Sequence, residues 1–346
     1  MEAYGRRPGI LDRVADGSLS PPQALELLAG REIGASARPY TGPARRPGGP
    51  DPGGPEGAER RDGDGLEQVM AELHALVGLE PVKRSLEAIG AYVEIQHRRR
   101  AVGLGCEPMV LHMAFKGNPG TGKTTVARLV GRMLKHMGAL SRGHTVEVER
   151  ADLVGEYVGH TAQRTREQIR KALGGVLFID EAYSLARGGE KDFGKEAVDG
   201  LVKAMEDHRH DLVVIMAGYR QEMELFLRMN PGLRSRIPFI LDFPDYSGEE
   251  LLCIADRMLQ ARDYRLTPEA RQRLGAVLWH CRLAELEHFG NARLVRNILE
   301  AAIRRQAVRL RGRPDLSRED LMRIAESDIP LGPQLEMGPI GLWLSR

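Results

Sequence analysis

The sequence of 346 residues predicts an α/β domain, a parallel sheet with helices on both faces, followed by a small all-helical domain. Short apolar runs alternate with stretches of helical periodicity between residues 66 and 245. Several of these runs are apolar throughout, which is typical of parallel strands covered on both faces. Beyond Asp245 the strand-like runs stop and helical spacing of apolar residues continues.

The elements of the first domain follow the chain in turn. Helical spacing runs through residues 66–100 around a turn at Val77–Leu79. Strand-like runs follow at Val110–Phe115, Thr145–Glu149, Val176–Ile179, Leu212–Met216 and Phe239–Leu241. Helices are expected between them, over Thr125–Met137, Arg164–Leu173 and Lys195–Asp207. Strands that alternate with helices predict parallel pairing through crossover connections, and this domain is expected to span residues 66–245.

The second domain, expected over residues 246–328, contains four predicted helices. Each begins at a residue whose side chain can cap a helix, namely Ser247, Thr267, Asn291 and Ser317. The helices end near residues 261, 280, 310 and 325. No strand is expected among them.

The two ends of the chain differ in composition from these domains. Residues 1–40 contain a short helical segment that Ser20 could cap. In residues 41–65, 13 of 25 residues are Gly or Pro. Such a segment buries too little apolar surface to offset the entropy of ordering, which predicts a disordered linker. Residues 329–346 form a tail without a recognisable motif.

Charge and cysteine content narrow the class of protein. The formal net charge of +2 balances 50 basic against 48 acidic residues, so nothing demands a nucleic-acid or membrane partner. Three widely spaced cysteines, Cys106, Cys253 and Cys281, suit reduced thiols in the cytoplasm. No apolar run is long enough for a membrane span, and no signal peptide is evident, so a cytoplasmic protein is expected.

A phosphate-binding motif lies between the first strand of the sheet and a helix. Residues Gly117–Thr124 read G-N-P-G-T-G-K-T and match G-x-x-x-x-G-K-[ST] at each fixed position. Backbone amides of such a loop can surround phosphates, Lys123 can reach the β- and γ-phosphates, and Thr124 can ligate Mg²⁺. The alternative is a glycine-rich turn that binds nothing. The predicted nucleotide-binding residues are Gly117, Asn118, Pro119, Gly120, Thr121, Gly122, Lys123, Thr124 and Thr125.

Two carboxylates end the apolar strand Val176–Ile179. In an open parallel sheet, ligands bind at the carboxyl ends of the strands, which places Asp180 and Glu181 beside the phosphate loop. Asp180 is the predicted carboxylate on the Mg²⁺ side, and Glu181 is the predicted catalytic residue that orients water. Alone, such a pair is also common on protein surfaces.

These elements together resemble an AAA+ ATPase over residues 66–327. The strings Leu153–Thr161, Asp180–Leu185 and Asn230–Arg236 resemble the branch that contains the red-type Rubisco activases and stage V sporulation protein K. The run Ala186–Gly194 is more similar to the sporulation protein. The resemblance implies a hexameric ring that binds ATP and Mg²⁺ at subunit boundaries.

The resemblance also implies roles for residues outside the phosphate site. Arg236, with Arg234 in reserve, matches the arginine that a neighbouring subunit presents to the γ-phosphate. Arg293 matches a second sensor at the start of a helix, while Arg296 on the same helix is expected to be solvated. The alternatives are a local ion pair for Arg236 and a solvated position for Arg293 too.

Three further assignments come from the same comparison. Tyr157 and Val158 match the pore loop that grips a partner chain, although Tyr157 could instead pack on the core. Val77–Leu79 matches the segment that packs on the adenine, and Val77 and Gly78 are its expected binding residues. The family's first sensor falls within Met216–Arg220, where Tyr219 is the nearest polar residue and its role is open.

The expected function is that of a ring ATPase that remodels an unidentified protein partner, and the resemblance suggests sporulation. An AAA+ ATPase acting on nucleic acid is the first alternative, disfavoured because residues 155–160 carry Glu156 and no Lys or Arg. A nucleotide-timed assembly scaffold is the second. Rubisco activase is the alternative within the family.

Overall fold

The computed structural model describes residues 62–105, 109–155, 157, 159–187, 193–284 and 289–330. The predicted helical segment of residues 1–40, residues 41–61 of the predicted linker and residues 331–346 of the tail lie outside the described residues. Within the described residues, no helix is both long and apolar enough to cross a membrane.

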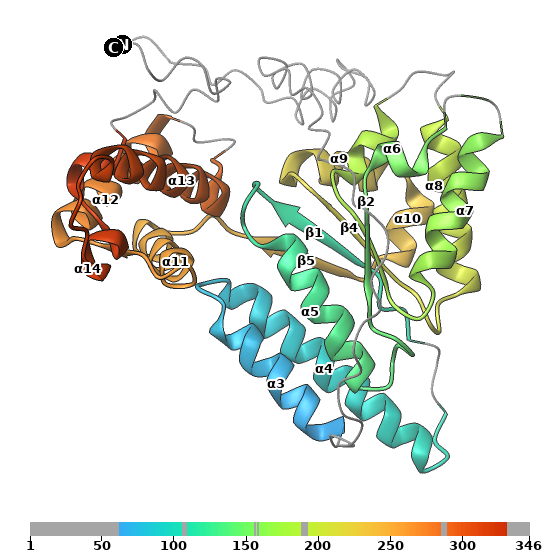
Figure 1. The fold of residues 1–346 in the computed structure, drawn as a ribbon. Helices are drawn as coiled ribbons and strands as arrows, with labels where there is room; N and C mark the ends of the chain where they lie inside the picture. Colours follow the sequence, from blue (N-terminus) through green and yellow to red (C-terminus); the bar gives the residue numbers. More distant parts are fainter. Residues whose placement is uncertain are drawn as a thin grey trace, which may run out of the picture.

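The first domain contains the predicted parallel sheet. Its five strands are β1 (Met113–Gly117), β2 (Thr145–Val148), β3 (Val176–Ile179), β4 (Val213–Gly218) and β5 (Phe239–Phe243). Their order is β2-β3-β4-β1-β5, and every neighbouring pair is parallel. The phosphate loop follows β1, which lies between β4 and the edge strand β5 (Figure 1).

Helices cover both faces of this sheet (Figure 1). On one face lie α3 (Asp62–Ala75), α4 (Glu80–Ala101) and α5 (Lys123–His136). On the other lie α6 (Arg150–Leu153), α7 (His160–Ala172), η1 (Ala182–Ala186), α8 (Gly194–Asp207), α9 (Arg220–Met229) and α10 (Pro231–Arg236). Along β3, Phe178 packs into the first core, whereas Leu177 packs into the second. This alternation explains why the strand is apolar throughout.

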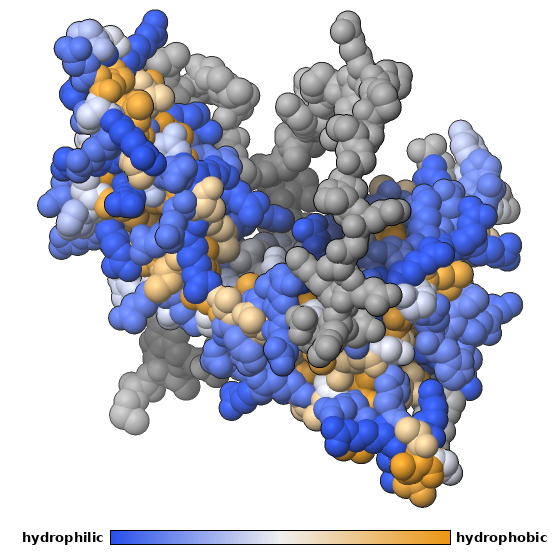
Figure 2. Space-filling model, turned by 60° about the horizontal axis from the view of Figure 1, so that its bottom comes forward, coloured by the Kyte–Doolittle hydropathy of each residue, from blue (hydrophilic) through white to orange (hydrophobic). Residues whose placement is uncertain are grey.

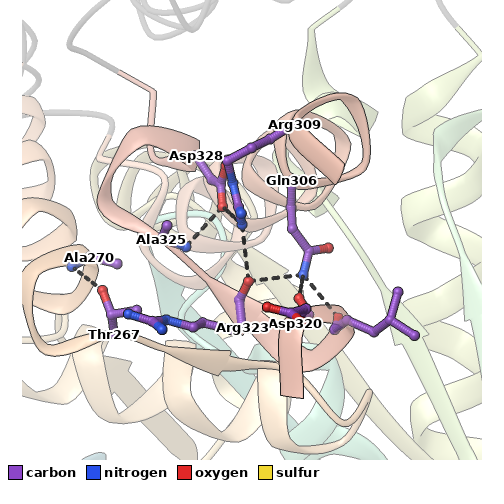
Figure 3. Close-up of polar contacts among 9 residues, drawn as sticks. Thr267, Ala270, Gln306, Arg309, Asp320, Arg323, Ala325 and Asp328 are labelled. Carbon is purple, nitrogen blue, oxygen red and sulfur yellow. Dashed lines mark hydrogen bonds and ion pairs between the residues drawn. The ribbon is translucent and has the colours of Figure 1, made fainter. Parts of the chain in front are cut away.

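The second domain, called the lid below, follows residue 245. It comprises α11 (Gly248–Gln260), α12 (Pro268–Ala284), α13 (Asn291–Leu310), α14 (Arg318–Met322) and η2 (Glu326–Asp328). Ser247 and Ser317 cap α11 and α14 as the sequence predicted. The Thr267 hydroxyl accepts a bond from the Ala270 amide at 3.1 Å, so it too caps its helix (Figure 3).

Buried hydrogen bonds and an ion pair hold the last segment of the lid against α13. Asp328 is 1% exposed and pairs with Arg309 through two bonds of 2.8 Å (Figure 3). The Gln306 amide nitrogen Nε2 donates to the backbone carbonyls Leu321 O at 2.9 Å and Arg323 O at 3.0 Å. A buried charge is tolerated because it is paired and hydrogen-bonded. These contacts fix the segment that ends in buried Ile329.

The structure corrects three expectations about boundaries. Helix α3 begins at Asp62, so residues 62–65 of the expected linker are helical. The lid is not purely helical, because β6 (Arg265–Leu266) pairs with β7 (Arg323–Ile324), where the last helix was expected to continue. Asn291 does not cap α13: Gly290 is the capping residue, and the Asn291 side chain is buried among other partners.

One face of the molecule is mostly hydrophilic (Figure 2). Figure 2 shows polar residues over most of one face, with smaller hydrophobic areas between them. Of the cysteines, Cys253 and Cys281 are free thiols, and Cys106 lies outside the described residues.

Candidate active site

A cavity of about 580 Å³ opens where the sheet, the phosphate loop and the lid meet. Its polar lining includes Lys123, Thr124, Thr125, Asp180, Glu181, Tyr219 and Arg293. Lys123 follows β1, Asp180 follows β3 and Tyr219 follows β4, so the site lies at the carboxyl ends of the strands. The sequence therefore predicted correctly that the phosphate loop and the carboxylate pair share one edge of the sheet.

The glycines of the phosphate loop are required by its shape. Gly120 and Gly122 have φ values of +71° and +92°, which other residues rarely adopt. A Cβ on Gly120 would lie 2.4 Å from Gly290 O, and one on Gly117 would lie 2.4 Å from Phe243 O. Helix α5 starts directly afterwards at Lys123, so its positive end faces the cavity. This is a cradle suited to an anion.

Lys123 is directed back across the loop. Its Nζ donates to Gly117 O at 2.8 Å and to Asn118 O at 2.9 Å. Burial lowers the pKa of Lys123 to about 8, while the nearby carboxylates of Asp180 and Glu181 act in the opposite direction. The ammonium group thus lies close to both carboxylates, in a site where charge is poorly solvated.

Asp180 and Glu181 both line the cavity, directly after the buried strand β3. Glu181 has a φ of +46°, an uncommon conformation for this residue, and its amide donates to Asp180 Oδ1 at 3.0 Å. Thr124 lines the same cavity. A hydroxyl and a carboxylate are hard oxygen donors of the kind that Mg²⁺ prefers, so these residues fit the ion.

Not every predicted nucleotide-binding residue lines the cavity. The Asn118 side chain donates to both carboxylate oxygens of Asp245 at 3.0 Å. Thr121 is fully buried, and its hydroxyl donates to Asn118 O at 2.8 Å. Val77 lines the cavity, whereas Gly78 does not, and a Cβ there would lie 2.2 Å from Glu250 Oε1. Asn118, Thr121 and Gly78 therefore do not contact the cavity, and their contacts within the protein support the segments that line it.

Several residues of the lining carry no motif. Leu79, part of the predicted adenine segment, lines the cavity with Val77, whereas Leu76 and the lid residues Tyr246, Ile254 and Met258 line it without belonging to a motif. Sequence reasoning missed the three lid residues because they occupy ordinary helix-core or loop positions. Their proximity to the phosphate loop follows only from how the lid folds back.

The lid also contributes cations. Arg293 lines the cavity as predicted, and its charge helps to lower the pKa of Lys123. Arg296 lines the cavity too, although it was expected to be an ordinary solvated arginine. Arg293 and Arg296 are three residues apart on α13 and therefore share a helix face. This spacing was the sequence signal from which the position of Arg296 at the cavity could have been predicted.

Two predicted functional positions lie away from this cavity. Arg236, at the end of α10, pairs with Glu206, with 3.2 Å between Nε and Oε2, and Arg236 and Arg234 are not among the lining residues. The local ion pair considered from the sequence is therefore present. Tyr157 is 66% exposed and contacts the His160 ring edge-on, so it is not a core residue. Val158 and Glu156 lie outside the described residues.

Comparison with known families agrees with this geometry. Residues 113–245 match the family described as "ATPase family associated with various cellular activities (AAA)". Residues 247–338 match the AAA lid domain. The boundary between the two matches falls at the junction between sheet and lid.

Similar proteins extend the match over most of the chain. Stage V sporulation protein K of Bacillus subtilis is 52% identical over 77% of this chain and 83% of its own length. Protein CbbX of Cereibacter sphaeroides is 47% identical over 78% and 87% of the two chains. The chloroplastic ribulose bisphosphate carboxylase/oxygenase activase of Cyanidioschyzon merolae is 45% identical over 76% and 91%.

A solved structure supports the fold. A RuvB mutant of Thermotoga maritima superimposes with a TM-score of 0.50 at 20% identity, covering 74% of this chain and 69% of the other. With the phosphate loop, the carboxylate pair and the lid assembled around one cavity, the chain belongs to the AAA family of ATPases and is an ATP-hydrolysing enzyme.

Proposed function

We propose that this protein is a ring-forming ATPase that uses ATP hydrolysis to remodel a protein partner. The observation that carries the proposal is the pairing of an ATP-sized cavity with an exposed aromatic side chain on a separate loop. Lys123 and Glu181 line the cavity, and Tyr157, on the loop before α7, is 66% exposed. Such a tyrosine offers a rigid, amphipathic contact to a bound chain at low entropic cost.

In this proposal the triphosphate lies between the phosphate loop and the carboxylate pair. Lys123, the amides of the loop and the positive end of α5 bind the phosphates. Thr124 and Asp180 hold Mg²⁺, which supplies charge neutralisation on the phosphate oxygens when bound. Glu181 orients a water molecule and accepts its proton. Leu76, Val77 and Tyr246 provide an apolar wall for the base.

Arg236 completes the site of an adjoining copy in this proposal. Its side chain is 32% exposed and lies outside the cavity of its own chain. An arginine supplied from a neighbour stabilises charge on the transferring phosphoryl group. It also makes hydrolysis depend on assembly, which suits a closed ring, expected to be a hexamer.

Two cellular roles are open to such a motor. The sporulation protein is 52% identical to this chain, and the two relatives from the carboxylase branch are 47% and 45% identical. We favour a sporulation client because of the higher identity. Carboxylase activation is the second candidate, favoured by the closeness of these values.

The decisive experiment compares ATP turnover under four conditions: with no addition, with DNA, with an inhibited ribulose bisphosphate carboxylase, and with proteins captured from the host lysate by the Glu181→Gln variant. If the protein remodels a partner, one of the added proteins should stimulate ATP turnover. That added protein should change its structure only when hydrolysable ATP is present. Stimulation by DNA alone would favour the nucleic-acid alternative. Assembly with ATP but no stimulation by any addition would favour the scaffold.

A further inference from the structure

Carbonyl groups along the phosphate loop accept hydrogen bonds from Lys123 and from residues beyond the loop. Lys123 Nζ bonds the first two, Gly117 O and Asn118 O. The next three accept from the domain junction and the lid: Pro119 O from Asn291 Nδ2 at 3.4 Å, Gly120 O from the Ala292 amide at 3.2 Å and Thr121 O from the Tyr246 hydroxyl at 3.2 Å. A carbonyl held in this way is not free to turn toward an anion in the cavity.

Asn291 is the centre of these lid contacts. Its side chain is fully buried, and its φ of +46° is uncommon outside glycine. Nδ2 donates to Asp245 Oδ1 at 2.7 Å and to Phe289 O at 2.8 Å, besides the long contact to Pro119 O. Oδ1 accepts from the Tyr246 amide at 3.0 Å. These partners fix which end of the amide faces the loop.

Asp245 connects Asn291 to the loop by a second route. Both of its carboxylate oxygens accept from Asn118 Nδ2 at 3.0 Å. One chain of hydrogen bonds therefore runs from the loop through the domain junction to the first residue of α13. The backbones also meet closely, because a Cβ on Gly120 would lie 2.7 Å from Arg293 N.

We propose that Asn291 is a positioning residue for nucleotide binding, which holds the phosphate loop in its anion-binding shape through Asp245 and Pro119 O. Because Asn291 belongs to the lid, the affinity of the loop for phosphate depends on the lid being docked. This role is separate from any direct contact between Arg293 and the nucleotide. The proposed role of Asn291 depends on the protein binding ATP, and it does not depend on the proposed ring or on the proposed protein partner.

The first test measures the Kd of a fluorescent ADP analogue. Asn291→Ala removes the donor to Asp245 and the acceptor for Tyr246, and is expected to weaken binding about tenfold or more. Asn297 lies two turns along the same helix and is half-buried, so Asn297→Ala is the matched control and is expected to bind as the parent does. Parent-like affinity in Asn291→Ala would overturn the proposal.

The second test uses Asn291→Asp, which keeps the shape of the side chain and the acceptor for the Tyr246 amide. It places a carboxylate against Asp245. The charged groups around this pair include Lys123, which interacts with Asp245, Arg293 on the same helix turn, and Arg282, which donates to Tyr246 O. Glu250, which acts on Tyr246, adds a further negative charge. Two carboxylates at this distance cannot both ionise easily, so lower pH lets them share a proton.

The ratio of the variant's Kd to that of the parent is therefore expected to be large at pH 7.5 and to fall toward one at pH 5.5. Adding Asp245→Asn to Asn291→Asp should reduce the ratio at pH 7.5, because it removes the like charge. A ratio that does not change with pH, or a ratio near one at pH 7.5, would overturn the proposal.

Discussion

Arg236 Nε lies 3.2 Å from Glu206 Oε2, so within a single chain the guanidinium is held by a carboxylate on α8. Arg236 Nη1 also donates to Gly232 O at 3.2 Å. Glu206 is about half exposed, so this ion pair contributes little to stability and can be exchanged for a stronger anion. A phosphate on an adjoining copy would be such an anion.

Arg236→Ala is expected to lower ATP turnover by a factor of about 10³ and to leave the Kd for ATP near that of the parent. The reason is that Arg236 lies outside its own cavity and would act only on the site of a neighbour. Mixing this variant with Lys123→Ala subunits should recover part of the rate, since mixed boundaries pair an intact cavity with an intact arginine. The measurement is steady-state phosphate release against mixing ratio.

Arg234→Ala is the control for this experiment, because Arg234 is exposed on the same short helix. If Arg234→Ala lost turnover while Arg236→Ala kept it, Arg234 would be the residue that acts across the boundary. A mixture with no recovered activity would argue against any action across subunits.

Glu181→Gln is expected to bind ATP as the parent does and to lower hydrolysis by a factor of about 10² to 10⁴. Glutamine keeps the side-chain size but cannot accept the proton of water. The ATP-bound assembly should therefore persist, which size-exclusion chromatography with light scattering would detect. Hydrolysis at the parent rate would exclude Glu181 as the group that activates water.

How far the site could be predicted depended on whether the signal was local. The phosphate loop and the strand before Asp180 were predictable because spacing and periodicity determine both within a few residues. The direction of the Asn291 side chain was not predictable from the sequence. A local cap preference placed it at the start of α13, but burial against Asp245 and the phosphate loop gave it other partners.

The wall formed by Tyr246, Ile254 and Met258 was missed for a related reason. An apolar residue at helical spacing is compatible with the lid core and with a binding site, and only the docking of the lid distinguishes them. Arg296 illustrates the same limit for a charged residue. Its three-residue separation from Arg293 placed both on one face, yet nothing local indicated that this face meets the nucleotide cavity.

Lys83→Met should weaken the wall beside the predicted base. Lys83 is buried, and its Nζ donates to His74 O at 3.2 Å and to Leu76 O at 2.9 Å, which fixes the segment that contains Val77. Losing these bonds should lower the free energy of unfolding by about 1–3 kcal/mol and reduce the preference for ATP over GTP. Urea denaturation and competition binding would measure the two effects.

Arg84→Met is the matched control, since Arg84 is exposed and makes one long bond to Glu80 O at 3.4 Å. It should change neither quantity. If Lys83→Met unfolded at the same urea concentration as the parent, the bonds of Lys83 to His74 O and Leu76 O would not contribute to stability.

Tyr157→Ala should spare basal ATP turnover, because Tyr157 does not line the cavity of Lys123. It should abolish partner-stimulated turnover and remodelling, because the aromatic contact with the client is lost. Tyr157→Phe keeps the ring and should retain most of both. Full remodelling by the alanine variant would remove Tyr157 from the client-binding loop.

Nucleotide binding should become weaker as pH rises through 8. Burial lowers the pKa of Lys123 to about 8, so above that pH the ammonium group of the free enzyme loses its proton. A bound triphosphate favours the charged form and raises this pKa, so binding at pH 8.5 must take up a proton, whereas binding at pH 6.5 need not. Calorimetry at pH 8.5 in two buffers of different ionisation enthalpy measures that proton.

Lys123→Arg is the control variant. Its side chain keeps its charge at every pH tested, so its affinity for nucleotide should not weaken in the same way as pH rises. Equal apparent enthalpies in the two buffers would show that Lys123 is already charged in the free enzyme.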